Sequence, residues 1–190
     1  MKKASFIRLL IAAVIYTALF ILGSSCGLIH PACYAYVGTV MPLLFSFVYL
    51  YTAADLQCFG AAAILNGTAL LISLIAGEGN PALIIGMVLL ALLAELIRGM
   101  NGYETLKGVR RSFIPFALSF YAYSAHWWTD TEGAIAAAAE EMPAGYAAKM
   151  EPVIQNIPLL IIMLIITVPV AVLGMRAAEK VLKKQTASLK

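Results

Sequence analysis

The stretch VIQNIPLLIIMLIITVPVAVLGM, residues 153–175, contains no charged side chain. The hydrocarbon core of a bilayer is about 30 Å thick, and a helix needs about 20 residues to cross it because each residue advances about 1.5 Å. The stretch is therefore predicted to be a transmembrane helix. It indicates an integral membrane protein if the rest of the sequence has the same character.

The remaining sequence has that character. Of the 190 residues, 62% are hydrophobic and 12% are charged, whereas soluble domains contain about 45–50% apolar and about 25% charged residues. Five more apolar windows of spanning length precede the first stretch. We predict an all-α integral membrane protein in which residues 1–190 form a single domain, with six transmembrane helices at residues 5–23, 36–54, 56–76, 81–98, 112–128 and 153–175.

The connections between these windows leave no room for a soluble domain. Short connectors join the second, third and fourth windows, so these helices are predicted to pack as antiparallel neighbours. The longest connection, residues 129–152, is rich in alanine, which favours helix, and is divided by Pro143 and Gly145. We expect one or two short helices there, lying at the membrane surface.

The basic residues predict the orientation in the membrane. All of the 13 lysines and arginines except Lys149 lie in the N-terminal segment, around the loop between the fourth and fifth windows, or in the C-terminal segment. With six spans these segments share one side, which the positive-inside rule assigns to the cytoplasm. Both termini are thus predicted to be cytoplasmic, and the acidic connection 129–152 external. The residues concerned are Lys2, Lys3, Arg8, Arg98, Lys107, Arg110, Arg111, Arg176, Lys180, Lys183, Lys184 and Lys190.

The first window also resembles a lipoprotein signal, because small residues precede Cys26. Its apolar region, however, reaches the upper limit of the about 7–15 residues that signal peptides use, so a retained helix is predicted. The three cysteines lack zinc-type spacing, and no metal site is expected. The sequence leaves open whether Cys26 and Cys33 form a disulfide.

The sequence contains no motif of the common enzyme classes. It has no Walker lysine loop, no GxSxG motif and no HExxH motif, so the chain is not expected to hydrolyse ATP by itself. His126 and Asp130 are one helical turn apart, but no serine or cysteine is placed to complete a nucleophilic set. We therefore predict that the protein is not an enzyme and uses no cofactor.

Few polar groups lie within the predicted spans, where they are costly in hydrocarbon. Asn66 in the third window is interpreted as a contact between helices in preference to a ligand contact. Glu95 in the fourth is interpreted as the ion-pair partner of Arg98, Arg110 or Arg111 in preference to a proton carrier. A channel or stand-alone secondary transporter, the main alternative function, would need more such groups along a route through the membrane.

The predicted outer rim is the region richest in functional side chains, and AHWWTDTEG, residues 125–133, is its centre. Tryptophan and tyrosine favour membrane interfaces, but aromatic faces beside a few donors and acceptors also form small-molecule pockets. We expect one tryptophan to face lipid while His126 or the other tryptophan faces a ligand. The predicted substrate-binding residues are His30, Tyr34, Asn80, His126, Trp127, Trp128, Asp130 and Asn156.

The order and spacing of several segments resemble the Trep_Strep family of small hydrophobic membrane proteins over nearly the whole chain. These segments are AELI at residues 94–97 with GY at 102–103, the alanine-rich connection before the last window, and the basic ending GMRAAEKVLKK at residues 174–184. The family is regarded as substrate-binding S components of energy-coupling factor (ECF) transporters, a type of ABC importer.

The resemblance implies an ECF S-component-like bundle in a prokaryotic plasma membrane that captures a vitamin-like micronutrient on its external side. The implied partners are a transmembrane coupling protein and two cytoplasmic ATPases, which fits the missing Walker motif. Many S components present small residues spaced as AxxxA on the first helix to the coupling protein. Ala12, Ala13 and Thr17 are the nearest equivalent and are the predicted docking residues. A membrane enzyme using His126 and Asp130 is a third alternative.

Overall fold

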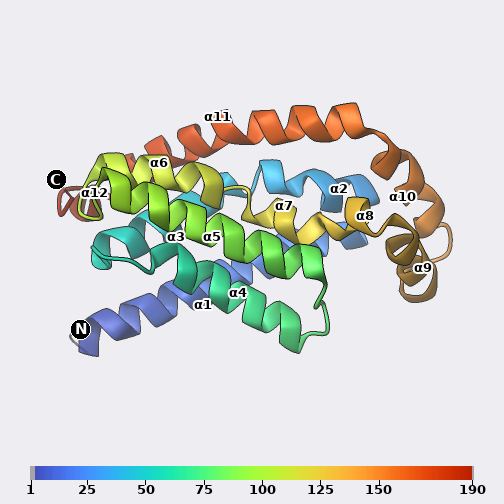
Figure 1. Ribbon diagram of the computed structural model, residues 1–190, viewed down its shortest axis with the longest axis horizontal. Helices are drawn as coiled ribbons and strands as arrows, with labels where there is room; N and C mark the ends of the chain where they lie inside the picture. The colour runs from blue at the N-terminus through green and yellow to red at the C-terminus, as the bar shows by residue number, and fades with distance from the viewer. Residues whose placement is uncertain (1–2, 190) are drawn as a thin grey trace.

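The computed structural model describes residues 3–189, which fold almost entirely as helices (Figure 1). No strand occurs in this range, as expected for an all-α protein. The helices are, in chain order, α1 (Lys3–Ser25), η1 (Cys26–Leu28), α2 (Pro31–Tyr36), η2 (Val37–Thr39), α3 (Pro42–Asp55), α4 (Ala61–Ile75), α5 (Pro81–Asn101), α6 (Leu106–Phe116), α7 (Ser119–Ser124), α8 (His126–Thr129), α9 (Thr131–Glu141), α10 (Tyr146–Gln155), α11 (Ile157–Val181) and α12 (Lys183–Thr186).

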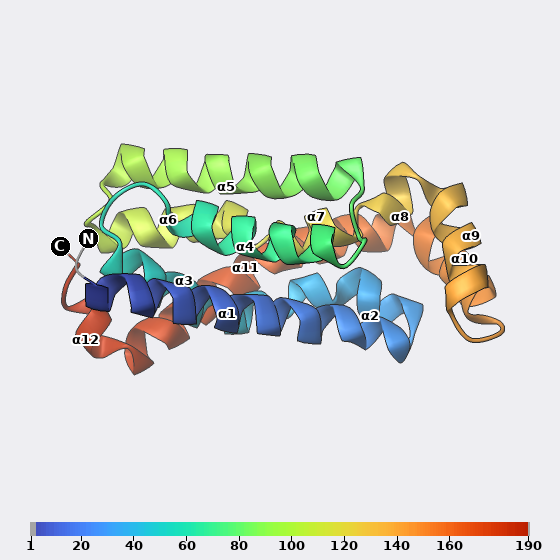
Figure 2. The same ribbon diagram turned by 90° about the horizontal axis from the view of Figure 1, so that it is seen from below.

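The helices form an elongated bundle, and most of them run along its long axis (Figures 1 and 2). The start of α1 and the whole of α12 lie at one end, which we call the terminal end, whereas α9 and α10 lie at the other, the lid end. α5 ends and α6 begins at the terminal end, so the basic residues of that turn gather there. Lys2 and Lys190, which contribute to the predicted orientation, lie outside the described residues.

Three helices of the described chain are long and apolar enough to cross a membrane: Ser5–Leu28, Pro81–Asn101 and Ile157–Val181. A fourth candidate is the pair formed by Pro31–Thr39 and Pro42–Asp55, which bends by 43°. α4 is also apolar, but its 15 residues fall short of the about 20 that a perpendicular span requires. The described residues thus contain three or four candidate spans, where the sequence predicts six.

The fifth predicted window, residues 112–128, is divided among α6, α7 and α8. α6 ends one residue after Pro115, which has no backbone N–H to offer a continuing helix. The N–H of Ala117 then bonds to the carbonyl of Phe113 (2.8 Å), and the N–H of Leu118 bonds to that of Pro115 (3.1 Å), a tightening common at helix ends. All six residues of α7 are buried. The apolar run therefore continues across both helix breaks, and a hydropathy window does not detect them.

Aromatic side chains fill the centre of the bundle, and aliphatic ones cover its outside. The ring of Tyr16 on α1 lies 4.7 Å from that of Phe45 on α3, and Tyr49 lies 4.6 Å from Phe116 on α6. All four side chains are fully buried. In α11, by contrast, only 17% of the apolar window is buried, and Ile165 is 64% exposed. Lipid is the environment that covers such an outer surface without cost.

Asn66 joins four helices inside this core. Its Oδ1 accepts a hydrogen bond from Tyr16 on α1 (3.0 Å), and its Nδ2 donates to the carbonyl of Met87 on α5 (3.2 Å) and to the hydroxyl of Ser119 on α7 (2.8 Å). The residue is 2% exposed. The interpretation of Asn66 as a contact between helices is confirmed.

The small residues of α1 face inward. Ala12, Ala13 and Thr17 are all buried, and α1 packs against α3 and α4, with α4 lying between α1 and α5 (Figure 2). The three residues predicted for docking are therefore buried within this chain, and their docking role stays a prediction. Small side chains allow helices to approach closely, and this internal packing accounts for their presence.

Glu95 and Arg98, both fully buried, close the terminal end between α3 and α4. Instead of forming the predicted ion pair, each binds backbone groups at a helix end. Oε1 of Glu95 accepts from the N–H of Ala62 (2.6 Å) at the start of α4, where the helix dipole favours a negative charge. Arg98 donates to the carbonyls of Leu56 and Tyr103 (2.8 Å each), and also to that of Ala53 in the last turn of α3.

Candidate functional site

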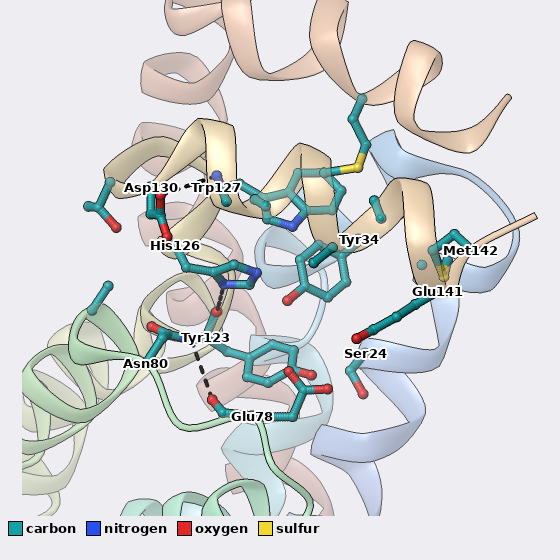
Figure 3. Close-up of a pocket in the computed structure, with 18 of the residues that line it drawn as sticks. Ser24, Tyr34, Glu78, Asn80, Tyr123, His126, Trp127, Asp130, Glu141 and Met142 are labelled. Carbon is teal, nitrogen blue, oxygen red and sulfur yellow. Dashed lines mark hydrogen bonds between the residues drawn. The ribbon is translucent and has the colours of Figure 1, made fainter.

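A cavity of about 870 Å³ opens at the lid end of the bundle. It is lined by the end of α1, by α2, by the start of α5, by α7 and α8, and by α9 and α10, which we call the lid (Figure 3). Small-molecule sites typically measure about 300–1,000 Å³. A second cavity, between α4 and α5, measures about 140 Å³ and is too small for such a ligand. The lid-end cavity is therefore the candidate binding site.

Three aromatic rings form the inner wall of the cavity. Trp127 stacks on Tyr34 with 4.6 Å between ring centroids and 27° between ring planes, and Tyr123 lies 5.6 Å from Tyr34. All three residues are at least nine-tenths buried. Tyr123 and Trp127 are four residues apart, so the α7–α8 segment presents them on one side. Close packing holds these rings in place, and they offer a ligand a preformed apolar surface.

His126 stands beside this wall with one ring nitrogen already used. Its Nδ1 lies 3.0 Å from the carbonyl oxygen of Tyr123. Because a carbonyl only accepts, Nδ1 must be the donor, and in the neutral imidazole Nε2 is then an acceptor. Figure 3 shows the His126 ring between Asp130 and Tyr34. The site therefore offers a ligand an oriented hydrogen-bond acceptor next to the aromatic rings.

The rim of the cavity is acidic. Glu78 in the α4–α5 turn, Asp130 before α9 and Glu141 at the end of α9 line the opening, and all three are exposed. Asp130 also has a structural task, because its Oδ1 accepts from the N–H of Gly133 (3.2 Å) and caps α9. Among the described residues that line the cavity, none is a lysine or an arginine. The opening therefore carries a negative potential.

The lid is tied to the bundle by side chains that bond to backbone carbonyls. Tyr146 on α10 donates to the carbonyl of Gly27 (2.8 Å), and Tyr36 and Trp128 donate to carbonyls of α10 (3.3 and 3.2 Å). Burial raises the pKa of the Tyr146 phenol, so it stays protonated and able to donate at physiological pH. These three bonds hold the roof of the cavity over its wall.

Five of the eight predicted site residues line the cavity: Tyr34, Asn80, His126, Trp127 and Asp130. They come from α2, the turn before α5, and the α8–α9 region, so residues up to about a hundred positions apart meet in one site. Asn80 also caps α5, because its Oδ1 accepts from the N–H of Leu83 (2.8 Å).

The other three predicted residues lie outside the cavity lining and serve local structure. His30 caps α2 and Asn156 caps α11, each by accepting a hydrogen bond from a backbone N–H two or three residues further on. Trp128 directs its indole N–H to a carbonyl of α10. In the tryptophan pair, Trp127 is thus the residue at the cavity, and Trp128 binds the lid.

Several lining residues are absent from the sequence-based set. Tyr123 has a usable signal, because it precedes Trp127 by one helical turn and must share its side. Glu78 precedes Asn80 in a short external turn, which is a weaker signal. Glu141 and Tyr146 belong to the 129–152 connection, and no local pattern indicates how that connection folds back over the bundle.

The cysteines near the cavity are not joined. Cys26 in η1 and Cys33 in α2 are both free thiols. The disulfide that the sequence leaves open is therefore not formed in this structure, and the first loop is held by packing and by the Tyr146 hydrogen bond instead.

Comparison with known proteins gives a family and no closer relative. No curated protein and no solved structure matches the chain. The sequence profile of the family described as hypothetical bacterial integral membrane protein (Trep_Strep) matches residues 4–187. This match takes in the whole bundle and every residue that lines the cavity. The chain therefore belongs to the Trep_Strep family of bacterial integral membrane proteins.

Proposed function

We propose that this protein is the substrate-binding S component of an ECF-type ABC importer in a prokaryotic plasma membrane. It captures a small micronutrient on the external side and delivers it through a transmembrane coupling protein that is driven by two cytoplasmic ATPases. In this proposal the chain binds and presents the substrate and catalyses no reaction.

The observation that carries the proposal is a cavity that is open at the lid end and closed below. Tyr34, Tyr123 and Trp127 form its inner wall, and beneath them the fully buried rings of the core, including Phe45 and Phe116, fill the bundle. A site of this shape can hold a ligand but does not conduct it. Movement across the membrane then needs a partner, which is how an S component works.

The proposed orientation follows from the charges. We assign the crossings to α1, the bent α2–α3 pair, α4, α5, the α6–α8 segment and α11, with the basic terminal end in the cytoplasm. The short α4 and the broken α6–α8 segment contact longer helices, and a neighbouring helix can shield irregular backbone from lipid. The cavity then opens to the outside, where an importer first meets its substrate.

Docking on the coupling protein is proposed to involve α1. Because Ala12, Ala13 and Thr17 are buried and α1 packs against α3 and α4, contact through these three residues requires α1 to separate from its neighbours. Docking through the outward face of α1, which carries exposed apolar side chains such as Val14, requires no such change.

Co-purification tests the proposal. The chain carries an affinity tag and is produced together with an ECF coupling protein and its two ATPases, and the complex is isolated in detergent. We expect the coupling protein and both ATPases to be retained in proportion to the tagged chain. Failure to associate, together with substrate uptake by the chain alone in liposomes, would favour a stand-alone transporter and refute the proposal.

Two controls accompany this experiment. An unrelated multi-pass membrane protein with the same tag should retain none of the three partners, which excludes retention by shared detergent micelles. The variant His126→Ala should retain them as well as the parent chain does, because the changed side chain lies at the cavity, at the end of the bundle opposite the proposed cytoplasmic surface.

A further inference from the structure

We propose that the ligand of the lid-end cavity is an organic cation. Its positive charge is held against the electron-rich rings of Tyr34, Tyr123 and Trp127 and the hydroxyls of the two tyrosines, beneath a rim formed by Glu78, Asp130 and Glu141. The inference rests on the proposed function only in taking this cavity as the substrate site, and it specifies the chemical class of the substrate.

The charged side chains that line the cavity are all acidic. Three carboxylates line the cavity, and none of its described lining residues is a lysine or an arginine. Glu78 and Glu141 form no ion pair with any side chain that the structure describes, so no described partner neutralises their charges. Carboxylates at the mouth of a low-dielectric cleft raise the local concentration of cations and repel anions.

The aromatic wall of the cavity also favours a cation, independently of the carboxylates. The faces of tyrosine and tryptophan carry partial negative charge and attract a cation within about 6 Å of the ring centroid. Tyr34, Tyr123 and Trp127 line the cavity and are 9%, 8% and 5% exposed, so little water contacts these residues. Cation–π attraction is stronger where the ring and the cation are desolvated.

One carboxylate, that of Glu78, lies close to the aromatic wall. Figure 3 shows Glu78 beside the ring of Tyr123, and Tyr34 between Tyr123 and Trp127. A cation in the cavity next to Tyr34 and Tyr123 would therefore meet the carboxylate of Glu78 as well as the aromatic rings. A neutral ligand would gain little from the rim, and an anion would be repelled by it.

Equilibrium dialysis with matched probes tests the inference. The purified protein is placed in nanodiscs of zwitterionic phosphatidylcholine, with empty nanodiscs as the blank. The probes are 1-methylquinolinium, which is a permanent cation, quinoline, its neutral parent at pH 7.5, and the anion 1-naphthoate. We expect saturable binding of the cation at least tenfold tighter than that of quinoline, no binding of naphthoate, and weaker cation binding as salt is raised.

Neutralised variants show whether the rim is responsible. The combination Glu78→Gln, Asp130→Asn and Glu141→Gln should weaken cation binding at least tenfold and leave quinoline unchanged. Asparagine at position 130 keeps a capping oxygen for α9, so the lid should stay folded, as a circular dichroism spectrum would verify. Glu140→Gln is the matched control, because Glu140 adjoins Glu141 and is also exposed but does not line the cavity.

The outcomes separate this inference from the proposed function. Equal affinity for cation and neutral probe, absence of saturable cation binding, or full cation affinity in the triple variant would each overturn the inference. None of these results bears on co-purification with the coupling protein. Conversely, cation binding as expected by a chain that fails to associate with a coupling protein would leave the inference standing and remove the proposed function.

Discussion

At the terminal end of the bundle, polar side chains are bonded to helix ends and to each other. Arg98 binds four backbone carbonyls and Glu95 caps α4, while Arg110 forms a two-point contact with Glu179 on α11 (2.7 and 2.6 Å). At the lid end, carboxylates and aromatic rings face an open cavity instead. Buried polar groups need partners, so polar groups that face a cavity without such partners are the ones available to a ligand.

Two buried polar atoms at the terminal end lack a hydrogen-bond partner. Oε2 of Glu95 and Nε of Arg98 are buried without a hydrogen-bond partner among the described residues. Each residue nevertheless places a charge at the helix end where the dipole stabilises it, Glu95 at the start of α4 and Arg98 at the end of α3. We therefore expect substitutions at the terminal end to lower the free energy of unfolding, and substitutions at the lid end to weaken ligand binding.

The largest loss of stability is expected for Arg98→Ala. The substitution removes the donor from one buried carbonyl, that of Ala53, and from three partly buried ones, those of Leu56, Cys58 and Tyr103. Each buried unsatisfied group costs about 1–3 kcal/mol. We expect the free energy of unfolding to fall by at least about 3 kcal/mol, measured by denaturation in mixed micelles. Arg111→Ala, which removes an exposed arginine bonded to Asn101, should change it by less than about 0.5 kcal/mol. Equal effects would contradict the role given to Arg98.

Asn66→Ala probes the middle of the bundle, away from both ends. It removes three hydrogen bonds to α1, α5 and α7, each worth on average about 0.6 kcal/mol inside a membrane protein. We expect a loss of about 2 kcal/mol in the same unfolding measurement, with unchanged affinity for 1-methylquinolinium. Thr68→Ala, on the same helix but bonded only to the carbonyl of Ile64 within it, is the matched control and should have little effect. Loss of affinity in Asn66→Ala would show that the core and the cavity are coupled.

The two histidines of the chain have different roles at the lid end. His126 lines the cavity, whereas His30 caps α2 outside it. His126→Ala should weaken 1-methylquinolinium binding about tenfold, equivalent to about 1.4 kcal/mol, because the imidazole ring lines the cavity and would pack against the bound probe. His30→Ala should leave the affinity unchanged and reduce stability by about 1 kcal/mol through loss of the cap. The reverse ranking would mean that the functional rim is the first loop.

Apolar windows predicted the helices well where length and hydropathy alone decide them, as in α1, α5 and α11. They failed at the α6–α8 breaks because Pro115 ends the helix inside a stretch that stays apolar and buried throughout. Small residues on α1 predicted a close helix contact but not its partner, since a small side chain fits equally well against α4 or another protein.

The candidate site was predictable to the extent that its residues sit at external helix ends. Tyr34, His126 and Trp127 have that position, and so do His30 and Asn156, which turned out to cap helices. Residue type does not distinguish a capping side chain from a ligand-facing one, because both roles favour short polar groups at helix starts. Rotation of the helix, which sequence does not give, decided between Trp127 and Trp128.

The smallest expected effect concerns the lid. Tyr146 bonds to the carbonyl of Gly27 across 119 positions of sequence, and Tyr146→Phe removes this single bond while keeping the ring. We expect a loss of about 1 kcal/mol, confined to the lid and visible as faster amide hydrogen exchange in residues 131–155. Exchange in α5 should not change, because α5 does not depend on this bond.

Since the bond holds the roof over the cavity, the probe should also dissociate faster, with its association rate less affected. Tyr51→Phe, on α3, serves as the control and should leave lid exchange as in the parent chain. If Tyr146→Phe exchanges no faster than that control, the Tyr146 bond does not hold the lid, and it does not set the rate at which the ligand is released.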